Sequence, residues 1–328
     1  MQGTLFRVRV TALLVLFAAA ATAQDVQELS PPSPANLLET LPVDAQRRST
    51  LQEAIGKRQY AAAENLLAEE ATKHPGSQAL LVALANVLFL DGKQLNTAVV
   101  LKKAELLGPL DERSRFLLAL SYISLGKKNL AIPELEKLEQ SNPSNAVYPY
   151  WLSRLTYRKT DLQQALSYAR KAVSLDPAFV KAHDQLGLCY AGLGQNAAAI
   201  RAYNDAIRLN REQSLHWPWP AMNLGTLYLR LERLDEAEAA LRESLAVEPR
   251  FPVAHLRLGS VLEKKDRLDE AVRELKETAA LDPTYPEPHY ALARIFKRQQ
   301  DTKSAQQELM LFENLRKVDK QKGITRPD

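Results

Sequence analysis

Residues 180–210 read VKAHDQLGLCYAGLGQNAAAIRAYNDAIRLN and contain two apolar patterns, each with the spacing of one helix face. His183, Leu186, Gly187 and Tyr190 stand at i, i+3, i+4 and i+7, a spacing that places them on one side of a helix. Ala199 and Tyr203, four residues apart, do the same in the second half. Gly192 and Gly194 lie between the two patterns. The stretch therefore predicts two amphipathic helices joined by a short turn.

This pattern recurs with a period of 34 residues. The period is marked by prolines at Pro75, Pro109, Pro143 and Pro177 and, after four extra residues, at Pro249 and Pro283. We number each repeat from 1 to 34 so that these prolines occupy position 32. Position 7 is then leucine in every repeat from Leu84 to Leu292, and position 8 in these repeats is a small residue. Position 20 is alanine in seven of eight repeats. Small side chains at positions 8 and 20 allow two helices to approach closely. Proline ends the second helix, because it lacks the amide donor and restricts the residue before it.

Residues 180–210 resemble the tetratricopeptide repeat, a 34-residue helix–turn–helix unit. The resemblance covers about residues 44–317 as eight repeats, which start near residues 44, 78, 112, 146, 180, 218, 252 and 286. It implies an all-α fold, a right-handed α-solenoid with a concave groove that binds peptides or other proteins. We expect this solenoid to occupy residues 44–322, with Met310, Phe312, Leu315 and Val318 continuing an apolar stripe into a helix that caps the stack.

Residues 1–23 have the features of a signal peptide. Two arginines precede an apolar run at 10–20, and Ala21-Thr22-Ala23 fits a cleavage site. The run is too short to span a bilayer, which needs about 20 residues. We therefore expect an exported bacterial-type protein, periplasmic or secreted, without stable membrane insertion after cleavage; a retained anchor is the alternative.

Residues 24–43, QDVQELSPPSPANLLETLPV, are expected to form a proline-rich flexible linker, with one helical turn at ANLLETL or a mobile arm that docks elsewhere as alternatives. A disordered tail is expected at residues 323–328. Without Arg7 and Arg9, 41 basic residues face 39 acidic ones, and the two kinds are interspersed. A mixed surface of this kind gives no expectation of nucleic-acid binding. Cys189, the single cysteine, lies in an apolar run and is interpreted as buried; a disulfide between chains is the alternative.

Motifs for chemistry are weak in this sequence. GLGQNA at 192–197 matches a dinucleotide fingerprint formally, but a helical pattern precedes it where a strand is required. His183, His255 and His289 share position 4 of their repeats, and equivalent helices about 8–10 Å apart could not bring them to one zinc ion. We therefore expect no metal, no cofactor and no enzymatic activity.

A binding groove is predicted on the face formed by positions 2, 5, 9 and 12 of the first helices, which lines the concave surface in the resembled family. The face is rich in apolar, aromatic and arginine side chains, which dominate interface energies. Its candidate residues are Phe116, Leu120, Tyr150, Arg154, Tyr157, Lys181, Trp219, Met222, Leu256, Tyr290 and Arg294. The alternative is that several of them pack against neighbouring first helices.

HWPWP, residues 216–220, falls at the four-residue insertion. Pro218 and Pro220 fit the first turn of a helix, so we expect the insertion to lengthen the preceding helix or loop. Trp217 is predicted to fill the junction between repeats five and six, and Trp219 to face the groove.

The function predicted from these features is a non-catalytic adaptor that binds a protein or peptide in its groove. Two alternatives are a structural component of an envelope secretion, pilus or polysaccharide assembly that uses the outer face, and an accessory subunit of an envelope enzyme. The partner and the oligomeric state are left open.

Overall fold

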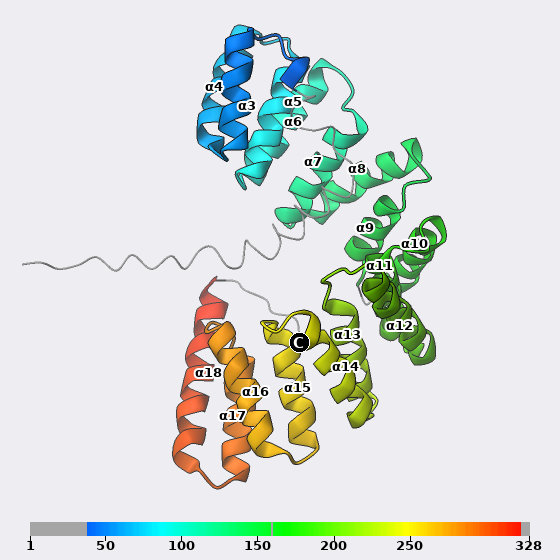
Figure 1. The fold of residues 1–328 in the computed structure, drawn as a ribbon, viewed down its shortest axis with the longest axis vertical. Helices are drawn as coiled ribbons and strands as arrows, with labels where there is room; N and C mark the ends of the chain where they lie inside the picture. The colour runs from blue at the N-terminus through cyan, green and yellow to red at the C-terminus, as the bar shows by residue number, and fades with distance from the viewer. Residues whose placement is uncertain (1–37, 159, 323–328) are drawn as a thin grey trace, which may run out of the picture. The chain divides into compact units, whose positions relative to one another are not determined.

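The computed structural model describes residues 38–158 and 160–322, and over these residues it consists of α-helices without a strand (Figure 1). The predicted all-α helical-repeat fold is confirmed. The signal peptide at 1–23, residues 24–37 of the linker and the tail at 323–328 lie outside the described residues. None of the described helices is long and apolar enough to cross a membrane.

The helices come in eight pairs. The first helices are α3 (Ala45–Gly56), α5 (Gln78–Leu90), α7 (Glu112–Ser124), α9 (Val147–Thr156), α11 (Val180–Gly192), α13 (Trp219–Arg230), α15 (Pro252–Lys264) and α17 (Glu287–Arg298). The second helices are α4 (Tyr60–Lys73), α6 (Gln94–Leu107), α8 (Lys128–Ser141), α10 (Leu162–Leu175), α12 (Asn196–Glu212), α14 (Leu234–Val247), α16 (Leu268–Leu281) and α18 (Thr302–Lys322). Each first helix begins within one residue of its predicted repeat start.

The chain divides into two compact units, unit 1 up to Leu155 and unit 2 from Thr156. In each unit a second helix packs both on its own first helix and on the first helix of the next repeat, as α14 does on α13 and α15. First helices also contact one another, α5 with α7 in unit 1 and α11, α13, α15 and α17 in series in unit 2. First helices therefore lie closer together than second helices and line the inner side of each stack.

A small residue at position 8 holds each pair except the first, which has Leu51 there. A Cβ added to Gly225 would lie 2.6 Å from Leu241 Cγ, and one added to Gly259 would lie 2.8 Å from Leu275 Cγ. At Gly187 the neighbour is the ring of Tyr203, 2.5 Å away. Glycine thus allows a large side chain at position 24 of the second helix to lie directly against the first helix, where it is fully buried.

The turn inside seven of the eight repeats has a left-handed residue at position 15. Glycine provides this conformation at Gly92, Gly126 and Gly194, where φ is 75°, 68° and 74°. Other residue types adopt it at Arg58, Glu232, Asp266 and Gln300. Glycine takes this conformation without the steric cost that a Cβ imposes, so the two sets of turns differ in strain.

The insertion at HWPWP lengthens α12 to 17 residues, against 14 in α14 and α16. Pro218 precedes α13, and Pro220 lies in its first turn. Asn210 Nδ2 donates to the Trp217 carbonyl at 3.1 Å, and Ser244 Oγ donates to the Pro218 carbonyl at 2.9 Å. Both expectations for this segment, the longer helix and the placement of the prolines, agree with the structure.

The boundary of the linker needs correction. Leu38 and Leu41, inside the predicted linker, are buried in one cluster with Leu51 of α3 and Leu67 of α4. Arg48 donates to the carbonyls of Leu41 and Val43 at 3.3 Å each. Two leucines three residues apart provide an apolar surface that covers the first repeat, so among the described residues packing already includes Leu38 and Leu41, within the segment where a helical turn was the alternative.

Candidate protein-binding face

The predicted groove residues fall in both compact units. Phe116, Leu120, Tyr150 and Arg154 belong to unit 1, and the remaining seven belong to unit 2. We call positions 2, 5, 9 and 12 of α11, α13, α15 and α17 the inner face of unit 2, because these first helices contact one another in series.

Six of the eleven predicted residues are buried, and for these the groove assignment is not supported. They are Phe116, Leu120, Tyr150, Lys181, Met222 and Leu256. The physical reason is visible at position 5, where Met222 and Leu256 enter one core cluster with Phe251 and Leu275. Phe116 similarly packs edge-on against Tyr148, with ring centroids 5.6 Å apart. Packing between neighbouring first helices, the alternative weighed above, explains these positions.

The other five predicted residues keep accessible surface. Arg154 is exposed in unit 1, where its guanidinium lies 4.4 Å from the Trp151 ring and donates to Tyr150 Oη at 3.1 Å. Tyr157 is half-buried, and its hydroxyl donates to the Leu188 carbonyl at 3.3 Å. Burial raises the pKa of Tyr157. Trp219 is half-buried, whereas Tyr290 and Arg294 are exposed.

On α11, α13 and α15 the accessible part of the inner face of unit 2 is mainly apolar, whereas α17 contributes the charged residues Glu287, Arg294 and Lys297. Leu188, Trp219, Leu229 and Val253 are half-buried along α11, α13 and α15. The hydroxyls between them turn inward: Thr226 Oγ1 donates to the Met222 carbonyl and Ser260 Oγ to the Leu256 carbonyl, both at 3.0 Å. Because these donors are already bonded to their own helices, they compete little for a ligand. The face can therefore bury apolar side chains of a partner.

The two tryptophans of HWPWP have different environments. Trp217 packs on Val180, Ala206 and Leu209 of repeat five, and the Lys181 ammonium lies 5.3 Å from its ring centroid. Trp219 contacts repeat seven, since its ring meets Phe251 edge-on with centroids 4.9 Å apart. Trp217 thus fills the junction, whereas Trp219 sits between repeats six and seven on the inner face.

A polar contact that the sequence analysis did not identify lies beneath this face. Asn223 Nδ2 of α13 donates to Asp184 Oδ1 of α11 at 2.8 Å, and Asp184 is buried. Both residues are polar at first-helix positions, but nothing in their spacing, 39 residues apart, singles them out as a pair. The contact fixes the relative position of two first helices that carry the face.

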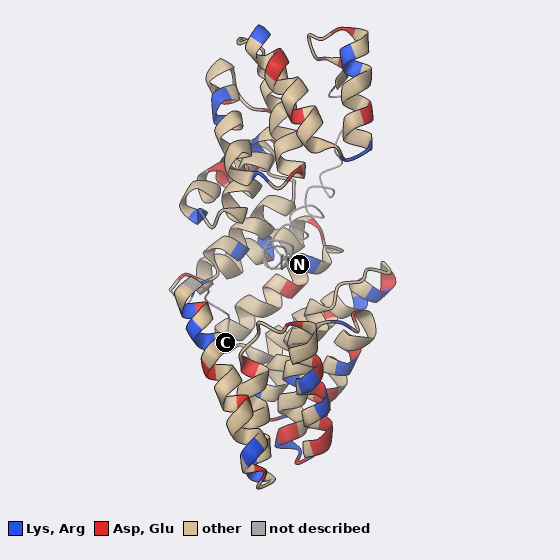
Figure 2. Cartoon of the chain, turned by 90° about the vertical axis from the view of Figure 1, so that its left-hand side faces the viewer, with Lys and Arg blue, Asp and Glu red and all other residues tan. Residues whose placement is uncertain are grey.

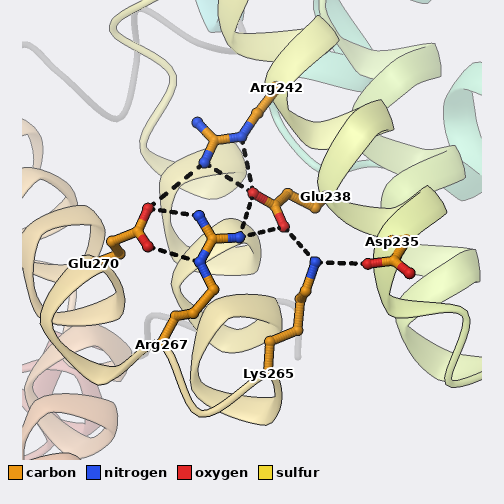
Figure 3. Close-up of polar contacts among 6 residues, drawn as sticks. All are labelled: Asp235, Glu238, Arg242, Lys265, Arg267 and Glu270. Atoms are coloured by element: carbon orange, nitrogen blue, oxygen red, sulfur yellow. Dashed lines mark hydrogen bonds and ion pairs between the residues drawn. The ribbon is translucent and has the colours of Figure 1, made fainter.

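A second missed feature is an ion-pair cluster between repeats six and seven (Figure 3). The Glu238 carboxylate accepts from Lys265 Nζ at 2.7 Å and from Arg267 Nη1 at 2.7 and 2.8 Å. Arg242 and Glu270 extend the cluster. Partial burial opposes ionisation of Glu238, but the three cations outweigh it and hold its pKa at about 2. Elsewhere Lys and Arg alternate with Asp and Glu on the helices, as expected (Figure 2).

The position-4 histidines bond within the fold. His255 Nδ1 lies 2.6 Å from Glu274 Oε2, and its Nε2 lies 3.0 Å from the Pro249 carbonyl. His289 has the same contact with Glu308, and His183 bonds the Pro177 carbonyl. Among the described residues no group of His, Cys, Asp and Glu could hold a metal ion.

The structure also shows the surroundings of Cys189 and of the GLGQNA segment at 192–197. Cys189 is buried, as expected, and Gln185 Nε2 donates to its Sγ at 3.7 Å. The glycines of GLGQNA lie at the end of α11 and in the following turn, which confirms that this sequence is a turn between helices.

Comparisons with known proteins agree with this architecture. Residues 116–179 and 222–286 match one family described as tetratricopeptide repeat, and residues 180–213 match another. The chain carries tetratricopeptide repeats. Residues 38–115 and 287–322 continue the same helix pairs in the structure beyond these matches.

Two related sequences match this chain over part of its length. The chain is 43% identical over 75 residues to a probable biofilm formation methyltransferase, WspC, of Pseudomonas putida, and 28% identical over 148 residues to BBSome complex member BBS4 of Bos taurus. The stretches cover 23% and 44% of this chain, but only 18% and 27% of those relatives. The chain thus spans less than a third of the length of either.

Among solved structures, an APC/C hetero-tetramer, Cut9-Hcn1, superposes with a TM-score of 0.62 at 17% identity, covering 87% of this chain and 56% of that one. Pseudomonas aeruginosa pilF superposes with a TM-score of 0.55 at 18% identity, covering 62% and 91%. At identities this low, the superpositions show that the fold is shared and nothing more.

Proposed function

We propose that this protein is a non-catalytic adaptor that binds a segment of a partner protein on the inner face of unit 2. The observation that carries the proposal is the half-buried apolar row of Leu188, Trp219, Leu229 and Val253, between which hydroxyls are turned into their own helices. Such a surface gains affinity by burying apolar side chains, about 25 cal/mol per Å² removed from water. An amphipathic helix or an extended peptide would satisfy it.

A capture experiment with variants tests the proposal. The full chain, its Trp219→Ala, Leu229→Ser variant and an Arg201→Ala control on α12 would be immobilised and exposed to extract of the host. Arg201 is exposed on a second helix, so its loss leaves the inner face intact. We expect a protein that the wild type and the control retain and the double variant loses, and its recombinant form should bind directly with the same ranking. Equal retention by all three proteins would contradict the proposal.

The alternative, a structural component that binds through its outer side, is supported by a different surface. On α6, Leu95, Val99 and Leu106 are exposed, Leu106 to 87%. Their spacing of four and seven residues places them on one outward stripe of a second helix. Replacing all three with glutamine would abolish binding under this alternative and leave binding unchanged if the inner face of unit 2 is used.

We further propose that the protein acts after export, on the basis of the composition of residues 1–23. Mass spectrometry of protein from the native host should find a chain that starts at Gln24. An intact segment from Met1 to Ala23 in the membrane fraction would support a retained anchor instead.

A further inference from the structure

The last repeat exposes positions that are covered in the two repeats before it. At position 24, Leu241 and Leu275 are fully buried, whereas Leu309 is 41% exposed. At position 5, Met222 and Leu256 are each 5% exposed, whereas Tyr290 is 49% exposed. Repeats six and seven are each followed by another first helix, α15 and α17, which packs on the preceding second helix. The same surface of repeat eight has no such cover among the described residues.

This surface is continuous and apolar, and we call it the end face; it consists of Tyr290, Leu309 and Phe312. The rings of Tyr290 and Phe312 lie with centroids 5.2 Å apart, so they connect α17 and α18. α18 runs without a break to Lys322, and Met310 and Val318 on it are exposed. Met310 and Val318 belong to the apolar stripe that was expected to cap the stack, and in the structure they add to the exposed apolar surface. In the two preceding repeats the equivalent surface receives an amphipathic first helix.

The charges at its border differ from those of the inner repeats. Repeat seven carries acids at positions 12, 15 and 18, and repeat six carries them at positions 15 and 18. These acids pair with bases of the next repeat, as in Glu263–Arg294 at 2.7 Å, Asp266–Arg298 at 2.6 Å and Asp235–Lys265 at 2.6 Å. Repeat eight has Lys297, Gln300 and Lys303 at these positions. Neither lysine forms an ion pair with a described residue.

The acid on this side of α18, Glu313, is followed three and four residues later by Arg316 and Lys317, with which it can pair along the helix. The Arg316 guanidinium lies 5.7 Å from the Phe312 ring, beside the apolar surface. The border of the end face thus carries lysines at positions 12 and 18, where repeat seven carries acids, although Asp301 adds one acid at position 16.

We propose that the end face is a second docking site, which binds an acidic amphipathic helix of a partner protein in the place that a further first helix would occupy. The contacts between inner repeats predict how this helix would fit. Its apolar stripe would cover positions 5 and 24 of repeat eight. Its carboxylates, at the equivalents of positions 9 and 14 of a first helix, would meet Lys297 and Lys303. The site shares Tyr290 and Lys297 of α17 with the inner face of unit 2. It does not depend on the function proposed above, because that function rests on the row of Leu188, Trp219, Leu229 and Val253 on α11, α13 and α15.

A second copy of this chain is the less suitable occupant. In head-to-tail stacking a second copy would present its first helix, α3, whose repeat has Gln52 and Lys57 at positions 9 and 14, where the end face requires acids. Lys57 would then lie against Lys303, and like charges in contact oppose association. The occupant must therefore differ from the repeats of this chain in charge but resemble them in apolar pattern.

Two stapled peptides made from residues 286–300 provide matched probes. In the acidic peptide Arg294 and Gln299, at positions 9 and 14, are replaced by glutamate; in the basic peptide Arg294 is kept and Gln299 is replaced by lysine. Binding of each fluorescent peptide to the full chain would be measured by anisotropy, with the wild type, a Lys297→Glu, Lys303→Glu variant and a Lys276→Glu control. Lys276 is exposed on α16, away from the end face.

We expect the acidic peptide to bind the wild type and the control equally well, and the double variant about tenfold more weakly. The double variant should instead prefer the basic peptide. Leu309→Gln should weaken both peptides. Equal binding of the two peptides to the wild type, or none at millimolar concentration, would overturn the proposal. Concentration-dependent dimerisation that Leu309→Gln abolishes would also overturn it, in favour of a second copy.

Discussion

Gly225 of α13 lies directly against Leu241 of α14: a Cβ on Gly225 would come within 2.6 Å of Leu241 Cγ and 3.2 Å of the Ala237 carbonyl oxygen. Even Gly225→Ala should therefore force the two helices apart, and Gly225→Leu should do so more strongly. Overpacking of this kind costs about 1–3 kcal/mol. Urea denaturation followed by circular dichroism should show the loss. Gly56→Ala is the control, because no atom lies within 4 Å of the added Cβ; a similar loss in both variants would contradict this packing.

The turns predict an opposite effect at Gln300. This residue adopts φ of 64° at position 15, where three other repeats have glycine. A side chain in the left-handed region costs about 1 kcal/mol relative to glycine. Gln300→Gly should thus stabilise the last repeat, and Gly194→Gln should destabilise repeat five by a similar amount. Thermal denaturation of both variants tests the pair; a decrease in stability for Gln300→Gly would show that backbone strain does not limit the stability of this turn.

Such local rules explain why the fold was predictable from the sequence. The proline at position 32, the small residue at position 8 and the leucine at position 7 act within one repeat, so each first helix begins where the 34-residue period places it. The groove was less predictable, because a helical wheel gives the direction of a side chain but not what covers it. Met222, Leu256 and Tyr290 share position 5, yet only Tyr290 is exposed, since no described helix follows.

Acid sensitivity should concentrate at Glu238. Its pKa of about 2 lies below the ordinary 4.5, so its ionised form stabilises the fold above about pH 4.5, and this contribution is lost as the pH falls toward 2. Glu238→Gln should remove a contribution on the order of 1–3 kcal/mol at neutral pH and flatten the stability curve in this interval. Glu212→Gln, which breaks an exposed pair with Arg208, is the control and should change little. Denaturation midpoints from pH 2 to 7 would measure both effects, and identical curves would refute the assignment.

His255 should titrate in the opposite sense. Burial disfavours its charged form, but the contacts with Glu274 and the Pro249 carbonyl outweigh burial and raise its pKa above 6.5. Its protonated form therefore stabilises the fold below about pH 6.5, and this contribution disappears as the pH rises through the folded-state pKa. Proton NMR titration should find this raised pKa, and Glu274→Gln should lower it. Glu313→Gln, on α18, should leave it unchanged; an equal effect of both substitutions would exclude the Glu274 contact as the cause.

The two tryptophans of HWPWP provide the test that separates a binding surface from a junction. Trp217 is half-buried and packs on Val180, Ala206 and Leu209, so Trp217→Ala opens a gap at this junction. It should destabilise the protein, but by less than a truncation at a fully buried position, which costs about 3–5 kcal/mol. Trp219 is also half-buried but meets Phe251 with one edge, so Trp219→Ala should cost less stability than Trp217→Ala.

If the inner face of unit 2 binds the partner, Trp219→Ala should instead weaken binding by about 2 kcal/mol or more, as expected for an aromatic residue at the centre of an interface. Trp217→Ala should leave affinity nearly unchanged at a temperature where the variant is folded. Titration calorimetry with the captured partner gives the affinities, and thermal denaturation gives the stabilities. Should Trp219→Ala unfold the protein, or lower stability as much as Trp217→Ala while affinity stays the same, both tryptophans serve only to join repeats five, six and seven.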